Sequence, residues 1–207
     1  LHFGELIESM EATVAILALG PAAVELVDSM IIRHARANLE YSRRMSFVQG
    51  DPAAILVVEM VGESEAEVGD KLDKLQERMV RSGLGYAVTR LMGPEEQADV
   101  WAMRRAGLGL MMNEPGAAKP LPFVEDTAVA PELLPQYVRR FEEIVRDNGT
   151  TAGYYGHASV GCLHIRPLID LKLQEGVDRM VSIAAQVSDL VLEYGGAMSG
   201  EHGDGLV

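Results

Sequence analysis

Cysteine is nearly missing from this sequence, and basic residues are few relative to acidic ones. The single cysteine, Cys162, excludes an internal disulfide framework and any metal site built from cysteines alone. The 18 Lys and Arg residues are outnumbered by 31 Asp and Glu residues, which gives a formal net charge of −13. So acidic a chain lacks the basic face that nucleic-acid binding or docking on an anionic membrane requires.

Long apolar runs and a leader sequence are also missing. No apolar run reaches the roughly 18–20 residues that a membrane-spanning helix needs, and no basic-then-apolar signal segment opens the chain. The apolar share of 48% is nevertheless ordinary for a globular domain, and 207 residues suit one domain with a sizeable core. Since the chain starts on Leu1 and stops on Val207 after a glycine-rich stretch, we expect an excised piece of a longer protein.

What is present is an alternation of helical and strand-like patterns. Apolar residues at helical spacing, with capping and stop signals, predict helices at 5–19, 64–81, 94–112, 131–148 and 175–194. Short β-rich or alternating stretches predict strands at 54–61, 85–91, 121–129, 150–157 and 163–169. Residues 22–32 fit either a strand or a helix. No repeat or linker divides the chain, and the predicted fold is α+β, an antiparallel sheet with helices packed on it.

Three of the five histidines, His157, His164 and His202, each lie within three residues of a glycine. Glycine lets the backbone bend closely around a bound group. Imidazole nitrogens and carboxylate oxygens are ligands of borderline divalent metals, and a catalytic site leaves one position open. His157, His164 and Glu201 would supply such a set if two strand ends meet at a tight turn. The alternative is that these are ordinary surface or strand-end histidines, and their spacing alone does not decide.

A second group of candidates is cationic. Arg104 and Arg105 lie on the predicted helix 94–112, Lys119 precedes a predicted strand, and Arg166 follows the second histidine of the group. Such side chains bind carboxylate or phosphate groups, and arginine often does so with two parallel hydrogen bonds. The simpler interpretation is a solvated helix face and a loop lysine.

The glycine-rich tail, residues 195–205, matches neither of the common phosphate-binding patterns. No lysine follows its glycines, as in a phosphate loop, and it does not join a strand to a helix, as a dinucleotide-binding fingerprint does. A flexible loop is the plain alternative. Cys162, which lies beside the predicted turn at 158–161, is interpreted as a small buried residue rather than a nucleophile.

Two motifs together resemble a known family. Residues 155–164 read YGHASVGCLH, and residues 199–205 read SGEHGDG. Paired in this way, they resemble the C-terminal domain of FAD-linked oxidases of the vanillyl-alcohol oxidase type, among them D-lactate dehydrogenases, glycolate oxidases and D-2-hydroxyglutarate dehydrogenases. The similarity continues through WxxR at 101–104 and AKPxxFVEDTAVxP at 118–131. It is greatest to long bacterial members that carry an iron–sulfur region.

The resemblance implies a role for each motif residue. His157, His164 and Glu201 match divalent-metal ligands, for zinc or a similar ion, and His202 matches the catalytic general base. A metal beside the α-hydroxyl and carboxylate of a 2-hydroxy acid lowers the pKa of the alcohol. A neutral imidazole can then accept the hydroxyl proton while the Cα hydride passes to the flavin. The implied cofactors are therefore FAD and a divalent metal.

The cationic residues have implied roles as well. Arg104 and Lys119 match positions that bind the substrate carboxylate. The family's usual motif, GHAGDGNLHxN, has Asp, Asn and Asn where this chain has Val160, Cys162 and Arg166. Because Arg166 adds a cation beside the metal position, we expect it to contact a distal carboxylate or other polar end of the substrate. The substrate then differs from plain lactate.

The resemblance also bears on the whole protein. It implies a ferredoxin-like α+β domain over residues 1–207, which forms the substrate- and metal-binding part of an FAD-dependent D-2-hydroxy-acid dehydrogenase for lactate, glycolate or 2-hydroxyglutarate. A preceding domain would bind the flavin, so this chain alone would neither hold FAD tightly nor turn over. Implied partners are that domain, the small 2-hydroxy acid, and an iron–sulfur region or other electron acceptor. The implied setting is cytoplasmic, with membrane association through electron-transfer partners.

Two other interpretations stay open. The first is a non-catalytic ferredoxin-like module for ligand binding or oligomerisation. The second is a self-contained metal hydrolase that uses His157, His164 and Glu201. A domain cut from its partner can also form a homodimer through the face that the partner covered.

Overall fold

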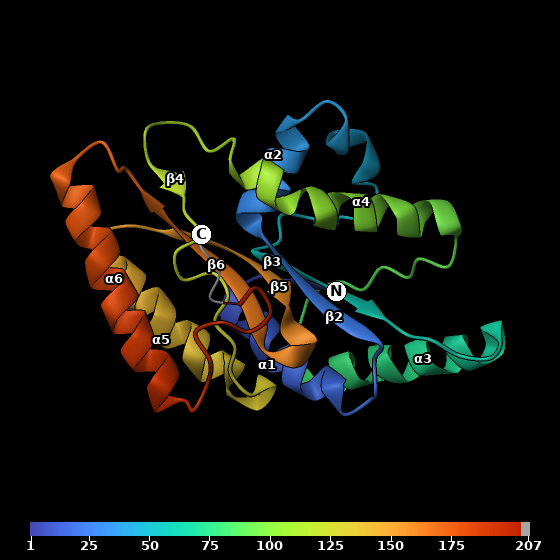
Figure 1. Ribbon diagram of the computed structural model, residues 1–207. Coiled ribbons are helices and arrows are strands. Elements are labelled where there is room, and N and C mark those ends of the chain that lie inside the picture. Colours follow the sequence, from blue (N-terminus) through green and yellow to red (C-terminus); the bar gives the residue numbers. More distant parts are fainter. Residues whose placement is uncertain (204–207) are drawn as a thin grey trace.

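A six-stranded antiparallel sheet forms the centre of the computed structural model, which describes residues 1–203 (Figure 1). The strand order is β1-β3-β2-β5-β6-β4. The predicted α+β class, a ferredoxin-like antiparallel sheet with helices packed on it, is confirmed. Asp204 and Gly205, the end of the second motif, lie outside the described residues. The strands are β1 (His2–Phe3), β2 (Ala23–Asp28), β3 (Ala54–Glu59), β4 (Lys119–Pro120), β5 (Ala152–His157) and β6 (Cys162–Ile169).

Helices cover both faces of the sheet (Figure 1). One core joins α1, α5 and α6 to the sheet face that carries Leu26 and Ile165. A second core joins α2 and α4 to the face that carries Val27 and Tyr155. None of the helices in residues 1–203 combines the length and the apolar character that a membrane crossing requires. The helices are α1 (Leu6–Leu17), α2 (Ser29–Ala37), α3 (Glu65–Ser82), α4 (Pro94–Met111), α5 (Leu134–Asp147) and α6 (Gln174–Glu193).

Local signals fix the helix ends. The Ser64 side chain accepts a hydrogen bond from the backbone at the start of α3, and Gly83 ends that helix in the left-handed conformation with φ of 67°. At the junction of β2 and α2, the Asp28 carboxylate accepts a hydrogen bond from the Ile31 N–H (3.1 Å). A strand therefore ends where a helix begins, which accounts for the mixed pattern of residues 22–32.

The hairpin of β5 and β6 carries the first motif. Its turn is a single 3-10 turn, η3 (Ala158–Val160), followed by Gly161 with φ of 72°. A Cβ atom at Gly161 would lie 1.8 Å from the carbonyl oxygen of Val129, so both the backbone conformation and the close approach require glycine. The predicted strands at 150–157 and 163–169 are confirmed, with the turn between them.

The predicted strand at 85–91 is wrong. In the structure this segment makes one bridge, between Ala87 and His2. Its alternating pattern is real, but β1 offers a partner of only two residues, so a longer ladder cannot form. Gly85, with φ of 75°, also turns the backbone away from an extended path.

The predicted strand at 121–129 is wrong as well. The strand in this region, β4, ends at Pro120, and Pro122 has no N–H to donate to a ladder. Beyond it, Ala128 makes single bridges to Cys162 on one side and Ala197 on the other. The segment is therefore an irregular connection held between β6 and the tail.

Candidate functional site

One face of the β5–β6 hairpin carries the polar side chains of the first motif. Tyr155 faces His164 across the two strands, and because side chains alternate along a strand, His157 and Arg166 lie on the same face. Strand β2 runs beside β5, and its Glu25 is opposite His157. These side chains therefore gather on the sheet face that α2 and α4 cover.

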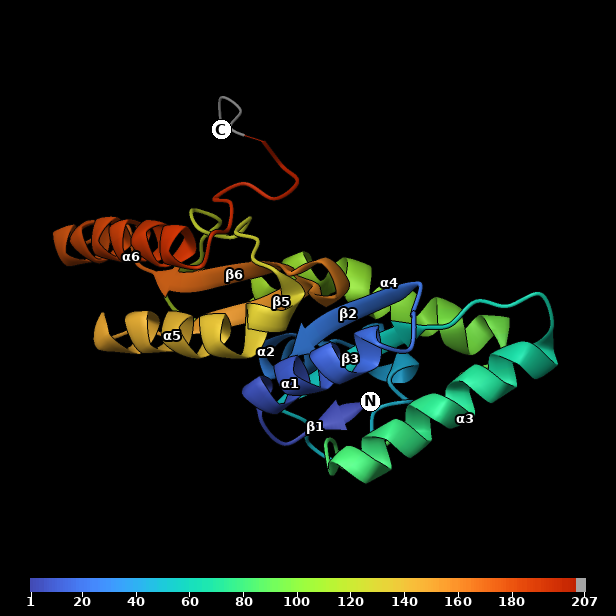
Figure 2. The same cartoon turned by 90° about the horizontal axis from the view of Figure 1, so that it is seen from below.

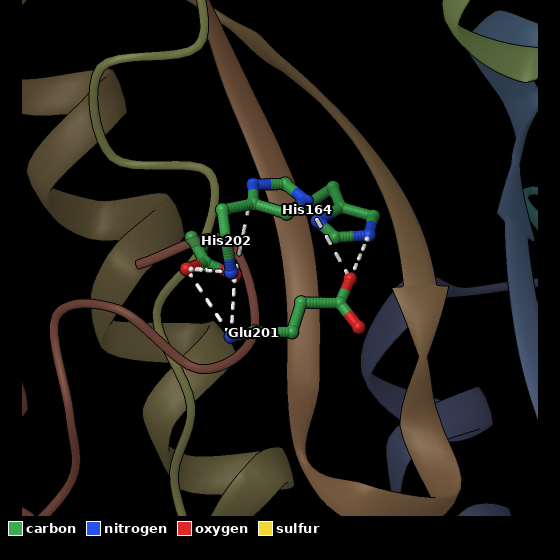
Figure 3. A group of neighbouring side chains, drawn as sticks. His164, Glu201 and His202 are labelled. Atoms are coloured by element: carbon green, nitrogen blue, oxygen red, sulfur yellow. Dashed lines mark hydrogen bonds and ion pairs between the residues drawn. The ribbon is translucent and has the colours of Figure 1, made fainter. Parts of the chain in front are cut away.

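The second motif reaches this face from the segment that follows α6. Figure 2 shows that segment on the opposite side of the sheet from α5. The Glu201 Oε1 atom lies 3.4 Å from Nε2 of His157 and 3.2 Å from Nε2 of His164. Figure 3 shows the Glu201 carboxylate pointing toward the rings of His164 and His202. The structure thus brings together the three predicted metal ligands, which come from β5, β6 and the tail.

Both of these histidines are anchored through their other ring nitrogen. His157 Nδ1 lies 2.8 Å from Glu25 Oε1, and His164 Nδ1 lies 3.2 Å from the carbonyl oxygen of Glu125. Carboxylate and carbonyl oxygens only accept, so each Nδ1 is assigned the hydrogen and each Nε2 presents a lone pair to Glu201. Burial lowers the pKa of His164, which favours its neutral imidazole at pH 7.

The donor set fits a divalent cation. Two ring nitrogens and one carboxylate oxygen face one another, and a divalent cation between them would accept a lone pair from each. Two nitrogens and one oxygen, with a fourth position open, are ligands typical of catalytic zinc. Asp126, His164, Glu201 and His202 also offer ligand atoms that all lie within 4.8 Å of one another.

Asp126 holds the tail in place. Its carboxylate accepts hydrogen bonds from the Ser199 hydroxyl (2.7 Å), the His202 N–H (2.9 Å) and the Glu201 N–H (3.2 Å). Its backbone carbonyl accepts one from the Gly200 N–H (2.7 Å). Burial alone would raise the pKa of Asp126, but these hydrogen bonds to its carboxylate lower it. With its oxygens engaged in this way, Asp126 fixes the backbone that carries Glu201 and His202.

His202 is the most exposed member of the cluster, with 49% of its side chain accessible. Its ring stacks on that of His164, with centroids 5.2 Å apart and planes at 8° (Figure 3). Its Nδ1 lies 3.8 Å from carboxylate oxygens of both Glu125 and Asp126, and its Nε2 lies 3.6 Å from Glu201 Oε1. An accessible imidazole beside a metal position suits proton transfer with a substrate that enters from solvent.

Two of the predicted substrate-binding cations are buried beside the histidines. The Arg104 guanidinium, from α4, donates a hydrogen bond from Nε to Glu25 Oε2 (2.9 Å), and its Nη2 forms an ion pair with the same oxygen at 2.7 Å. Arg166 forms an ion pair with Glu125. Both guanidinium groups lie over the Tyr155 ring, 5.2 and 6.0 Å from its centroid. Each arginine is therefore within the site and already paired with a carboxylate.

The third predicted cation, Lys119, lies apart from the cluster. It is part of β4 and pairs with Ile169, at the other end of β6 from the turn next to His157. Its amino group donates a hydrogen bond to the carbonyl oxygen of Glu114 (2.6 Å). The structure does not bring Lys119 into the group formed by the metal-ligand candidates.

Sequence reasoning missed the three acids that organise the site, Glu25, Glu125 and Asp126. Two signals were available: Glu25 interrupts an apolar stretch, and the other two acids are adjacent within the motif string at 118–131. Their roles depend on partners far along the chain, such as Arg104 at 79 residues from Glu25 and Glu201 at 75 residues from Asp126. No local pattern reveals such pairings.

Comparison with known proteins gives a match along the whole chain. The family model for "FAD linked oxidases, C-terminal domain" matches residues 1–207. The chain is 32% identical to a D-2-hydroxyglutarate dehydrogenase of Pseudomonas putida over 214 residues, which cover 100% of the chain and 21% of that protein. It is 33% identical to a D-2-hydroxyglutarate dehydrogenase of Escherichia coli over 195 residues, 89% of the chain and 19% of that protein. The chain thus spans about a fifth of the length of these dehydrogenases.

More distant relatives extend the comparison. Glycolate oxidase subunit GlcD of Bacillus subtilis is 25% identical over 189 residues, which cover 89% of the chain and 37% of that protein. Among solved structures, p-cresol methylhydroxylase with substrate bound superposes with a TM-score of 0.65 at 14% identity, over 95% of this chain and 43% of that one. A 4-ethylphenol oxidase from Gulosibacter chungangensis gives a TM-score of 0.54 at 14% identity and the same coverage. At this identity the two structures establish the fold.

Proposed function

Because the chain belongs to the family of FAD-linked oxidase C-terminal domains, we propose that it is the substrate- and metal-binding part of an FAD-dependent D-2-hydroxy-acid dehydrogenase. The names of its relatives, D-2-hydroxyglutarate dehydrogenase and glycolate oxidase, support this class of substrate. Since the chain spans about a fifth of the length of the dehydrogenases, the activity belongs to a longer protein in which FAD is bound mainly outside residues 1–207.

The observation that carries the proposal is the convergence of His157 Nε2 and His164 Nε2 on the Glu201 carboxylate, at 3.4 and 3.2 Å. These three residues would hold the metal ion. When bound, a divalent metal would lower the pKa of the substrate's α-hydroxyl, and FAD would accept the hydride from Cα. The side chain of His202, half exposed beside them, takes the hydroxyl proton.

The cations of the site orient an anionic substrate. Arg104 keeps the carboxylate-binding role that the family resemblance implies, whereas Lys119, which lies apart from the cluster, is not assigned that role. Arg166 is the candidate for the distal carboxylate of a substrate such as 2-hydroxyglutarate, because its buried Nε atom has no hydrogen-bond partner within the described residues. A second carboxylate on the substrate would satisfy this donor.

Turnover by the full-length enzyme tests the proposal. Purified enzyme would be supplied with D-2-hydroxyglutarate, D-lactate and glycolate in turn, with an artificial electron acceptor, and its metal content measured by atomic absorption. We expect oxidation of at least one of these acids, dependent on bound FAD, and loss of both metal and turnover in His164→Ala. Metal-dependent hydrolysis without flavin would instead identify a metal hydrolase. A protein with neither metal nor turnover would be a non-catalytic module, and either result would overturn the proposal.

A further inference from the structure

A chain of three side chains connects α4, β2 and β5 behind the proposed metal site. Glu25 lies in its centre with only 8% of its side chain exposed. Its Oε2 atom accepts a hydrogen bond from Arg104 Nε (2.9 Å) and forms an ion pair with Nη2 (2.7 Å). Its Oε1 atom lies 2.8 Å from His157 Nδ1. One oxygen of this buried carboxylate thus contacts an arginine, and the other contacts a candidate metal ligand.

Glu25 determines which ring nitrogen of His157 is directed toward the proposed metal position. The hydrogen bond to Glu25 places the ring hydrogen on Nδ1, so that Nε2 points toward Glu201 with its lone pair free. A carboxylate that accepts from the far nitrogen of a histidine also makes that histidine a better metal ligand. His157 depends on this support more than His164 does, because its side chain is 36% exposed against 7%.

Arg104 in turn fixes Glu25. A buried carboxylate without a cationic partner is unfavourable. The ion pair with Arg104 neutralises Glu25, and the hydrogen bond from Arg104 Nε sets its orientation. The guanidinium is itself held, since it lies over the Tyr155 ring at 5.2 Å and only 10% of the side chain is exposed. Its position therefore does not depend on a substrate.

We propose that Arg104 is a positioning residue for the metal: through Glu25 it holds His157 in the orientation in which Nε2 binds the ion. This inference rests on the proposed metal site but goes beyond the substrate-binding role implied for Arg104. It assigns that arginine an effect on metal affinity that exists without any substrate. The two roles can therefore be separated by a measurement on the enzyme in the absence of a 2-hydroxy acid.

The test is a Co²⁺ titration of the metal-free full-length enzyme without substrate, followed by isothermal titration calorimetry. Arg104→Met removes the guanidinium at similar length, and Glu25→Gln removes the carboxylate charge. Arg105→Met is the matched control, because it removes the same charge from the adjacent, exposed position of α4. Circular dichroism and thermal unfolding confirm that each variant is folded. Arg104→Lys serves as a second variant if Arg104→Met is not.

We expect Arg104→Met and Glu25→Gln each to weaken Co²⁺ binding by roughly 10- to 100-fold, as changes to groups behind metal ligands do. Arg105→Met should bind like the unsubstituted enzyme, and Arg104→Lys should recover part of the loss. The double variant should lose little more than Glu25→Gln alone, because both act through the same carboxylate.

Two results would overturn the inference in different ways. If the unsubstituted enzyme binds Co²⁺ and Arg104→Met binds it equally well, the positioning role of Arg104 is wrong, while the proposed metal site stands. If the unsubstituted full-length enzyme binds no Co²⁺, the metal site itself is wrong, and the positioning role of Arg104 is wrong with it.

Discussion

Arg166 and Glu125 form a buried ion pair beside the stacked rings of His164 and His202. Burial raises the pKa of Glu125, although the positive charge of Arg166 lowers it in part. Glu125 does not occupy all the donors of the guanidinium, because Arg166 Nε stays unpartnered among the described residues. This residue is therefore the partner of an internal acid, with its buried Nε atom left unpaired among residues 1–203.

The role proposed for Arg166 predicts a substrate preference. In the full-length enzyme, Arg166→Ala should lower kcat/KM for D-2-hydroxyglutarate by roughly 10- to 100-fold more than for D-lactate, since a charge-assisted contact to the distal carboxylate is lost only for the former. Steady-state kinetics with both acids measures the ratio. Any loss common to both substrates reports the uncompensated Glu125 and cancels in the ratio.

A second substitution sharpens this test. Arg166→Asn introduces the residue that the family's usual motif carries and has no charge to offer a distal carboxylate. It should shift selectivity in the same direction as Arg166→Ala. Equal losses for D-2-hydroxyglutarate and D-lactate in both variants would contradict the assignment of Arg166 to the distal group.

The residues that the sequence could identify are those whose neighbours along the chain share their function. His157 and His164 flank one turn, and Glu201 adjoins His202, so each pair appears as one motif. Glu25, on strand β2, could not be found in this way, because its role depends on Arg104 of helix α4. The role of a buried acid depends on its counter-charge, and only the folded chain determines which cation lies beside it.

The connection at 121–130 and the tail after α6 act as one element. Ala128 and Ala197 exchange two backbone hydrogen bonds, at 2.9 Å each. Asp126 then binds the next turn of the tail through the Ser199 hydroxyl and the backbone N–H groups of Glu201 and His202. Two irregular segments thus place half of the candidate site without a strand or a helix.

Removing the Asp126 charge should selectively loosen the tail residues Glu201 and His202. In Asp126→Asn, an amide N–H₂ group replaces one accepting oxygen, so we expect hydrogen exchange at the Glu201 and His202 amides to become roughly 10- to 100-fold faster. Exchange measured by NMR reports each amide separately. The Ala197 amide is the internal control, because its partner is a backbone carbonyl. Unchanged exchange at Glu201 and His202 would show that the tail is held by other contacts.

The accuracy of the predicted helices and strands depends on whether an element is stabilised by local or by long-range contacts. The five predicted helices are confirmed, because helical spacing and capping residues are local properties. The segments 85–91 and 121–129 carry strand-like patterns but lack a partner long enough for a ladder. Strands need a neighbour, and the neighbour is set by the fold rather than by the strand's own residues.

The formal net charge of the whole molecule, −13, does not indicate the local charge at the candidate site. Arg104 and Arg166 lie buried on one face of the sheet, each against a glutamate, so these four charges cancel in pairs. An anionic substrate is therefore not excluded by an acidic chain, because binding depends on the local arrangement of charges.

Asp28 ties three parts of the whole fold together. It ends β2, caps α2 through the Ile31 N–H (3.1 Å), and accepts a hydrogen bond from the Tyr154 N–H of β5 (2.7 Å). Burial raises the pKa of Asp28 to about 6, although both N–H donors lower it. The folded chain therefore binds a proton on Asp28 more tightly than the unfolded chain, where the pKa is about 3.9.

The contribution of Asp28 to stability should fall as the pH rises. Because the folded-state pKa is the higher one, this contribution is fully present below about pH 4 and is lost as the pH rises past about 6. The difference corresponds to about 3 kcal/mol in the free energy of unfolding. In Asp28→Asn the side-chain oxygen can still cap α2, but the titration is gone. Urea unfolding of both proteins at pH 4, 5, 6 and 7 isolates the effect, because the other titrating groups are shared.

The free energy of unfolding of the unsubstituted chain, minus that of Asp28→Asn, should be largest at pH 4 and decrease toward pH 7. The Tyr154 N–H loses a good acceptor in the variant at every pH, which shifts the whole difference by a constant and leaves its slope unaffected. A difference that stays flat from pH 4 to 7 would mean that Asp28 titrates as it does in the unfolded chain. A difference that grows with pH would mean that the two N–H donors outweigh burial and that the carboxylate is the favoured form.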